Sequence, residues 1–323
     1  MKQNESLKIV VEKEREVIGL ALGGGAARGW AHIGVIQELI RQGVRIDVIS
    51  GTSAGALVGA VYISGFLDEF AEWVCNLKWD AMIRYGDLGI KEGGIISGKR
   101  LLKALDPFIV NSNIEDLPIP FGAVATDLGT GRGVWIRKGP LTEAVRSSIS
   151  LPGLFSPVHE GENWLVDGGL VDPVPVSLCR ALGATKVIAV NLNGEMVRKN
   201  LQELQEPDPL DPLQPHADSH LEGFRSMLHK IPGLNHLVET MPNGMVGHNH
   251  KTPGMLNVIM GALYIMQDKI TRSRMAGDPP EVLLAPRLGN IGLLEFDRAA
   301  DAIEEGRAVV DRFKPLIMNE INE

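Results

Sequence analysis

A serine flanked by glycines, in the segment ISGTSAGALVGA (49–60), constrains the fold of this chain most strongly. The apolar run VRIDVIS leads into it, and the small-residue stretch AGALVGAVYISG follows it. Between a strand and a helix, a G-x-S-x-G sequence forms a sharp turn that exposes the serine hydroxyl. Ser53 is therefore a candidate nucleophile. It needs a base within hydrogen-bond reach, because a free hydroxyl is a weak nucleophile.

Apolar runs of strand length alternate with helical patterns along the rest of the chain. A long amphipathic helix is predicted over 296–317. The other predicted helices are 26–43, 54–65, 141–150 and 175–184. Strands separated by helices predict an α/β fold in which a mostly parallel sheet carries helices on both faces. The predicted strands are 17–23, 44–50, 121–128, 134–138, 163–169, 186–193 and 281–286.

Residues 195–253 interrupt this order with the composition of a loop or lid. Proline and acidic residues crowd EPDPLDPLQPHADSH, and turn formers crowd PNGMVGHNHKTPG. The apolar, methionine-rich stretch 255–267 that follows is expected to be a core helix rather than a lipid-binding surface. We expect an N-terminal tail, residues 1–16, and one catalytic domain, residues 17–323. Within the domain we expect a motif-bearing core (17–191), this insertion (195–253) and a helical C-terminal part (254–323).

The composition is that of a globular protein with a sizeable core. The chain has 323 residues, of which 44% are hydrophobic. A formal charge of −8 argues against nucleic acid as a partner. Cys75 and Cys179 are too few for a disulfide framework and lack metal-ligand spacing, so we expect no metal and no other cofactor. The N-terminus has no signal-peptide core and no apolar run approaches about 18 residues, so the expected compartment is the cytoplasm.

Carboxylates are the stronger candidates for the base. Ligands of an open parallel sheet bind beyond the carboxyl ends of its strands. Asp167 is predicted at such an end, where Gly168 and Gly169 allow a sharp turn. Asp127 also ends a strand and is the competitor, whereas Asp47 is expected inside its strand, where it faces the site less well.

Histidines are the alternative, since a Ser-His-Asp triad would recruit one from downstream of the serine. None clearly ends a strand, and most lie in the loop-like insertion. His32 is upstream, in the first predicted helix, where a structural role is favoured. The downstream candidates are His159, His216, His220, His229, His236, His248 and His250.

A glycine-rich stretch, LGGGAARG (22–29), lies at the first strand–helix junction. Its backbone N–H groups are unshielded at the positive end of a helix dipole, which suits a phosphate or the oxyanion of an acyl-transfer intermediate. The stretch does not match G-x-G-x-x-G. Arg28 is a cation at a helix N-terminus, against the dipole. It is either a solvated side chain or a residue that orders the loop or meets an anionic substrate.

In this order, GGGAARG, GTSAG and DGG resemble the patatin-like phospholipase family. The spacing and flanks are similar to a bacterial branch related to the esterase domain of neuropathy target esterase. SSISLPGLFSPV (147–158) and DGGLVDPVPV (167–176) extend the match, which is strong over residues 17–191 and thin across 195–280. The resemblance implies an α/β/α sandwich and a Ser–Asp dyad without a catalytic histidine.

By this resemblance, Ser53 is the nucleophile and Asp167 the base. Gly24, Gly25 and Ala26 align with the oxyanion loop, where Ala26 replaces a glycine found in many members, and the N–H of Ala54 is a further donor. The expected reaction is hydrolysis of lipid acyl esters through an acyl-serine, by an enzyme that visits a bilayer surface to collect its substrate. The sequence indicates no oligomeric state.

Two readings from other classes stay open at this point. One is a nucleotide-binding protein that uses 22–29 as a phosphate loop, with an acid such as Asp47 on the ribose. The other is a catalytically silent regulator that keeps the fold as an interaction module. The broken loop spacing and the serine turn argue against the first, and the presence of both Ser53 and Asp167 argues against the second.

Overall fold

A mixed sheet forms the centre of the computed structural model, which describes residues 15–77, 103–152, 154–194 and 255–322. The strand order is β5-β6-β3-β2-β1-β7-β8, and β4 pairs with β3 off this path. Neighbours from β3 to β8 in this order are parallel, whereas β4, β5 and β6 pair antiparallel. The strands are β1 Ile18–Leu22, β2 Val48–Thr52, β3 Phe121–Asp127, β4 Gly133–Ile136, β5 Val158–Glu160, β6 Asn163–Asp167, β7 Lys186–Val190 and β8 Val282–Leu284.

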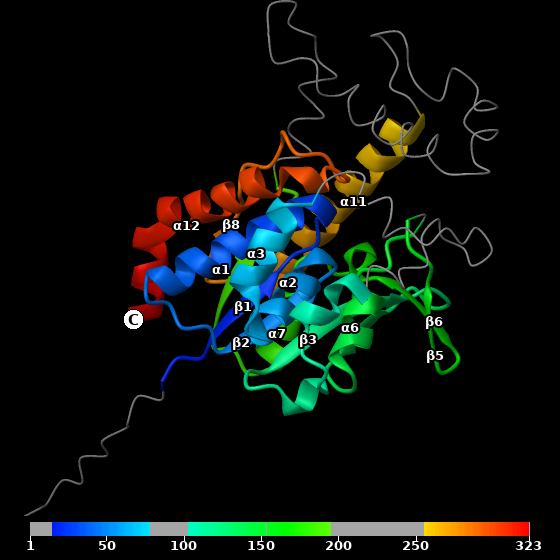
Figure 1. Ribbon diagram of the computed structural model, residues 1–323, viewed down its shortest axis with the longest axis horizontal. Helices are drawn as coiled ribbons and strands as arrows, with labels where there is room; N and C mark the ends of the chain where they lie inside the picture. Colours follow the sequence, from blue (N-terminus) through cyan, green and yellow to red (C-terminus); the bar gives the residue numbers. More distant parts are fainter. Residues whose placement is uncertain (1–14, 78–102, 153, 195–254, 323) are drawn as a thin grey trace, which may run out of the picture.

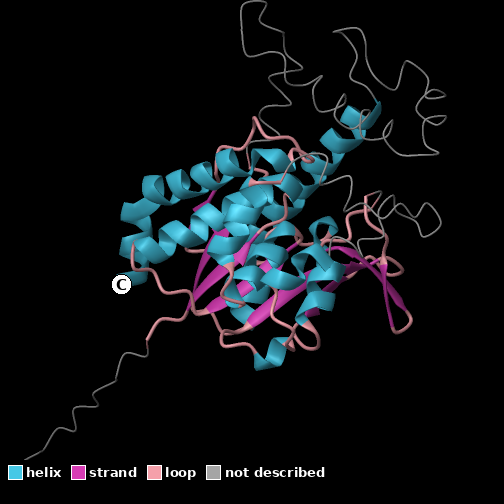
Figure 2. Ribbon diagram, in the orientation of Figure 1, coloured by secondary structure: helices cyan, strands magenta, loops and turns pink. Residues whose placement is uncertain are grey.

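Helices cover both faces of this sheet (Figures 1 and 2). Side chains of a strand alternate between its faces, and β1, β2 and β7 accordingly supply two apolar clusters. The larger cluster joins one face to α1, α2, α3 and α12, and the smaller joins the other face to α7. The predicted three-layer α/β/α architecture with a mostly parallel sheet is therefore confirmed. The α-helices are α1 Ala31–Arg41, α2 Ala54–Ile63, α3 Leu67–Cys75, α6 Leu141–Ser148, α7 Val176–Ala181, α11 Met255–Gly277 and α12 Ala299–Asn322.

The second strand begins later than the sequence predicts. Asp47 precedes β2 instead of lying inside it, because its carboxylate accepts a hydrogen bond from the Ile18 amide (3.0 Å) and pairs with Arg45 (2.8 Å). Apolar residues before the strand are buried in the turn that follows α1. The first predicted helix also differs, since it starts as a 3-10 turn, Ala26–Trp30, before α1. The predicted insertion 195–253 lies outside the described residues.

Two strands share one edge of β3, and their meeting point positions the site. β4 occupies the other edge of β3 across Ala123–Thr126. A strand has only two hydrogen-bonding edges, so β2 and β6 divide the remaining one: β2 pairs as far as Val124, and β6 begins at Ala125. The carboxyl ends of β2 and β6 therefore meet head to head, since the two strands run in opposite directions.

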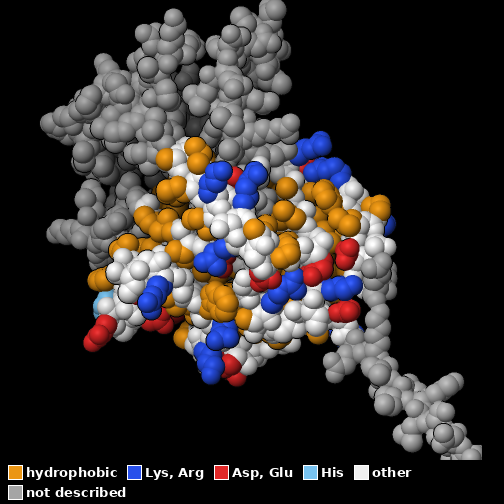
Figure 3. All heavy atoms as spheres, turned by 180° about the vertical axis from the view of Figure 1, so that it is seen from behind, with side chains coloured by type: hydrophobic (Ala, Val, Ile, Leu, Met, Phe, Trp, Pro, Cys, Tyr) orange, Lys and Arg blue, Asp and Glu red, His pale blue; other side chains and the backbone are white. Residues whose placement is uncertain are grey.

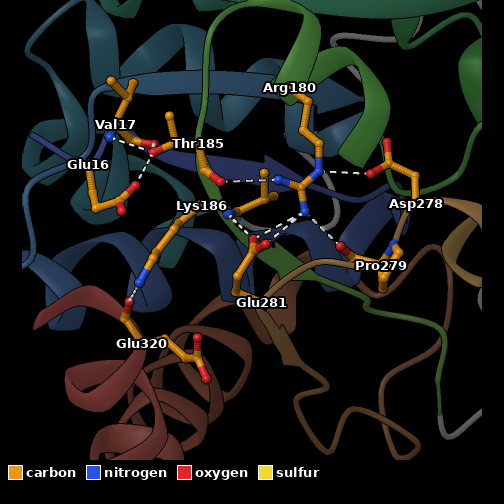
Figure 4. Close-up of polar contacts among 10 residues, drawn as sticks. Glu16, Val17, Arg180, Thr185, Lys186, Asp278, Pro279, Glu281 and Glu320 are labelled. Carbon is orange, nitrogen blue, oxygen red and sulfur yellow. Dashed lines mark hydrogen bonds and ion pairs between the residues drawn. The ribbon is translucent and has the colours of Figure 1, made fainter. Parts of the chain in front are cut away.

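A polar network fastens the C-terminal end of α11 to the sheet (Figure 4). The Arg180 guanidinium, on α7, binds the Asp278 carboxylate (2.8 Å) and the Glu281 carboxylate (2.9 Å). Glu281 in turn accepts from the amide of Val187 on β7 (2.6 Å). The helix is thus anchored beyond its last turn, while residues nearer its start reach the end of the sheet where β1 and β2 end.

The described surface carries charges of both signs. On the face shown in Figure 3, basic and acidic side chains lie among exposed apolar ones. Among the described residues, no helix is both long enough and apolar enough to cross a membrane.

Candidate active site

Ser53 occupies a sharp turn between β2 and α2. Its backbone dihedrals, φ 55° and ψ −124°, lie where non-glycine residues are rarely found. Strain of this kind concentrates at functional sites. Gly55 is required nearby because α2 passes so close to β1 that a Cβ at this position would lie 2.1 Å from the Leu22 carbonyl oxygen. The turn therefore holds the Ser53 hydroxyl at the start of α2, at the positive end of the helix dipole.

Asp167 ends β6 directly opposite this turn. Ser53 Oγ donates to Asp167 Oδ2 at 2.5 Å, and the amide of Gly169 donates to Oδ1 at 2.7 Å. The carboxylate is buried. Burial raises its pKa to about 6, against the opposing effect of these two hydrogen bonds. The group is therefore ionised at neutral pH, yet its pKa lies closer to the working pH than that of an ordinary aspartate.

Asp167 reaches the site from a strand whose direction differs from the predicted one. The sequence predicts Asp167 at the carboxyl end of a strand that runs with the parallel ones, but β6 is antiparallel to β3 and runs opposite to the strands that end at this edge. The strand reaches the site because it enters from beyond that edge and stops at the level of Ala125, next to the end of β2.

Ser148 was not singled out in the sequence, although it holds the turn in place. Its hydroxyl accepts from the Ser53 amide (2.8 Å) and donates to the Val124 carbonyl (2.6 Å). It thus replaces the ladder hydrogen bonds that are lost where β2 leaves β3. The sequence signal was weak, because a serine in a helical stretch such as SSIS gives no indication of which backbone groups it meets.

The glycine-rich loop faces the same site. Gly24, Gly25 and Ala26 line one pocket with Ser53 and Asp167. The amide of Gly24 is engaged, since it donates to the carbonyl of Pro173 at 2.9 Å. Ala26 takes the left-handed conformation (φ 47°) that a glycine adopts more easily.

A buried histidine supports this loop. His32 Nε2 donates to the carbonyl oxygen of Gly23 at 2.7 Å. Burial lowers the pKa of His32 to about 4, so the imidazole is neutral at physiological pH. It is not among the residues that line the pocket. The geometry agrees with the structural role that its position in the first helix favoured.

Arg28 is fully buried and lines the pocket. Its guanidinium lies over the Tyr264 ring, 4.7 Å from the ring centroid, and Nε makes a long contact (3.5 Å) with the Gly25 carbonyl. Neither Nη atom has a hydrogen-bond partner in the described part of the chain. Arg28 is thus not the solvated side chain that was one of its two expected states. Its two free donors are costly to bury unless a ligand binds them.

The remaining candidate acids and bases lie elsewhere. Asp127 caps the turn between β3 and β4, accepting from the Gly129 amide (2.9 Å) and the Thr130 hydroxyl (2.8 Å), and these bonds lower its pKa. Asp47 lies at the start of β1, whereas the glycine loop follows the end of that five-residue strand, about 16 Å away at 3.3 Å per residue. The nucleotide-binding alternative loses its ribose contact for that reason.

His159 is exposed on β5 and packs against Trp164 with 4.6 Å between the ring centroids. It is not among the pocket residues. The other downstream histidines, His216, His220, His229, His236, His248 and His250, lie outside the described residues.

α11 forms one wall of the site and supplies residues that the sequence did not indicate. Leu263, Tyr264 and Gln267 line the pocket. One face of this helix is buried and the other exposes Ile265 and Met266. The expectation of a core helix over 255–267 therefore holds for one face of its described part. Side chains 255–260 lie outside the described set.

Comparison with known proteins agrees with this geometry. The family model for patatin-like phospholipases matches residues 20–180. The uncharacterized NTE family protein Rv1063c of Mycobacterium tuberculosis is 34% identical over 90% of this chain and 89% of its own length. A second NTE family protein of that species, Rv2565, is 31% identical over 90% of this chain and 45% of its length. Lysophospholipase NTE1 of Coccidioides immitis is 28% identical over 94% of this chain and 18% of its length.

Together these matches define the class of the protein as a hydrolase. The chain belongs to the patatin-like phospholipase family, and Rv1063c, which it matches over most of that protein's length, is an NTE family protein.

Proposed function

We propose that this protein is a serine acyl hydrolase that cleaves fatty acyl esters of lipids, phospholipids included, with Ser53 as nucleophile and Asp167 as base. The observation that carries the proposal is the direct 2.5 Å hydrogen bond from Ser53 Oγ to a buried carboxylate. No imidazole stands between these two groups. Family membership supports the lipid acyl ester as substrate class.

The reaction follows from this contact. Asp167 takes the Ser53 proton as the hydroxyl oxygen attacks the ester carbonyl carbon, and an acyl-serine forms when the alcohol leaves with that proton. Water then attacks the acyl carbon, gives a proton to Asp167 and releases the fatty acid, and the proton returns to Ser53. The raised pKa of Asp167 makes it a more effective base at neutral pH than an exposed aspartate.

Backbone amides at the glycine loop and at the start of α2 would stabilise the oxyanion. The amides of Gly25 and Ala26 make no hydrogen bond within the described residues, and the same holds for Ala54. The Gly24 amide binds Pro173 instead, so Gly24 acts through its place in the loop. Donors fixed in advance by backbone geometry are worth about 3–4 kcal/mol each to an acyl-transfer transition state.

Arg28 would bind an anionic group of the substrate beside the ester. Two buried Nη donors without a partner match the oxygens of a phosphate or carboxylate. The Tyr264 ring holds the guanidinium from one side, which restricts its orientation. This arrangement favours phosphate-bearing esters over neutral ones of the same chain length.

Access to lipid would come through α11. Its outward face presents Ile265 and Met266, 47% and 54% exposed, and the exposed Lys269 lies one turn further. An apolar patch beside a cation on a helix that covers the catalytic pocket suits weak, reversible contact with a lipid surface. We propose that one catalytic domain, residues 17–323, carries both the site and this contact.

Release of free fatty acid from micelles and vesicles tests the proposal. Wild-type protein should hydrolyse an acyl ester of a lipid, and Ser53→Ala should reduce the rate to background with an unchanged melting temperature. Equal rates for the two proteins would refute it.

A further inference from the structure

A chain of side-chain amides connects the glycine loop to α11. Asn193, which follows β7, donates from Nδ2 to the Gly24 carbonyl (3.3 Å) and to Oε1 of Gln267 (3.1 Å). Asn193 is buried, and Gln267 lines the pocket with Ser53 and Asp167. Gln267 is therefore held in a defined position relative to the oxyanion loop.

The two hydrogen bonds of Asn193 also determine which end of the Gln267 amide faces the pocket. A backbone carbonyl only accepts, so the Asn193 atom that meets Gly24 must be the nitrogen. That nitrogen also donates to Gln267, so the Gln267 atom it meets must be the oxygen. The Gln267 nitrogen is left as the free end, and Nε2 makes no hydrogen bond within the described residues.

Gly169 shows where Nε2 lies. A Cβ built on Gly169 would be 3.0 Å from Gln267 Nε2 and 3.0 Å from Asp167 Oδ1. The two polar atoms are thus at most 6.0 Å apart, the sum of these distances. Any side chain at position 169 would fill the space between them. One water molecule spans a donor and an acceptor at such a separation.

We propose that Gln267 positions the water that hydrolyses the acyl-serine intermediate, with Nε2 donating to the oxygen of a water whose proton is directed at Asp167. The inference rests on the proposed function and assigns the second half of the reaction to a residue of α11. As the water oxygen bonds to the acyl carbon, its proton passes to Asp167. The bond between that carbon and Ser53 Oγ then breaks, and the serine takes the proton back.

This role explains why α11 is fastened so firmly. The Arg180 network anchors its C-terminal end (Figure 4). A water-positioning amide needs a fixed backbone, because misplacement by about 1 Å costs on the order of a hundredfold in rate.

The two half-reactions separate this role from a merely structural one. Gln267→Leu keeps the volume and removes the donor, and Ser273→Ala, at an exposed position of the same helix, is the matched control. Each protein is mixed with a short-chain nitrophenyl ester, the acylation rate is taken from the first turnover, and the acylated fraction is followed by intact mass. Ser53 fluorophosphonate labelling gives a second measure of acylation.

For Gln267→Leu we expect decay of the acyl-enzyme at least tenfold slower than in wild type, with acylation and labelling within twofold. Gln267→Glu, which keeps the shape and lacks the donor when ionised, should give the same selective loss if the leucine variant does not fold. Equal slowing of both steps, or unchanged decay, would overturn the inference. Failure of the proposed function has a different signature, since wild type itself would then neither be labelled at Ser53 nor form an acyl-enzyme.

Discussion

Replacing Asp167 by asparagine separates the chemistry of the site from its packing. The Gly169 amide donates to Oδ1 at 2.7 Å, so the asparagine oxygen must take that position and its NH₂ group must face Ser53. Ser53 then accepts a hydrogen bond where it formerly donated one, and it has no base. Loss of a general base costs about 10²–10⁴-fold in rate, or roughly 3–5 kcal/mol in barrier height.

The same substitution should stabilise the fold at neutral pH. Burial raises the pKa of Asp167 from 3.8 to about 6, so the folded state disfavours the ionised carboxylate by about 3 kcal/mol at pH values above 6. Below pH 3.8 the carboxyl group is protonated in both states and the penalty is absent. Asparagine carries no charge, so Asp167→Asn should unfold at a higher temperature than wild type at pH 8, and the gain should disappear near pH 4.

The assay is the first-turnover release of nitrophenol, with circular dichroism and thermal melting at both pH values. Retention of more than about a tenth of the wild-type rate, a loss of only about 1.4 kcal/mol, would refute the assignment of the base. A lower melting temperature at pH 8 would refute the electrostatic reasoning.

Further predictions concern pH, the anion and the lipid surface. The acylation rate should fall with an acid limb near pH 6, where Asp167 becomes protonated. The pKa of the buried Asp172 carboxyl is also raised to about 6, so Asp172→Asn is the control. The acid limb should persist in that variant because it belongs to Asp167, and its loss would contradict this assignment. Arg28→Met should lower kcat/KM for a lysophospholipid at least tenfold more than for a monoacylglycerol with the same acyl chain, and an equal loss on both would contradict anion binding. Ile265→Asp should reduce co-sedimentation with vesicles while leaving hydrolysis of a soluble ester unchanged, and undiminished binding would remove α11 as the docking face.

Local sequence patterns were sufficient to predict the fold class and to identify Ser53 and Asp167 as candidates. Glycines on both sides of Ser53 predicted the turn because only a residue without Cβ allows α2 to approach β1, and apolar runs of strand length predicted the sheet. The direction of β6 could not be predicted, since pairing partners depend on which edge of β3 is free. Asp167 lies beside Ser53 although β6 runs opposite to the assumed direction.

Local sequence patterns could not identify residues whose contacts join distant parts of the chain. Ser148, Asn193 and Gln267 are ordinary polar residues in the sequence, and each acquires its role only where separate elements meet. The buried state of Arg28 could not be predicted either, because the residue that covers it, Tyr264, lies on α11, far along the chain.

Active-site labelling tests the central claim most directly. Wild-type protein is treated with a fluorophosphonate probe, digested, and mapped by mass spectrometry, with Asp167→Asn as the matched variant. We expect a single adduct on the peptide that contains Ser53, formed at least a hundredfold more slowly in the variant. An adduct on any other residue, or equal labelling rates in the two proteins, would contradict it.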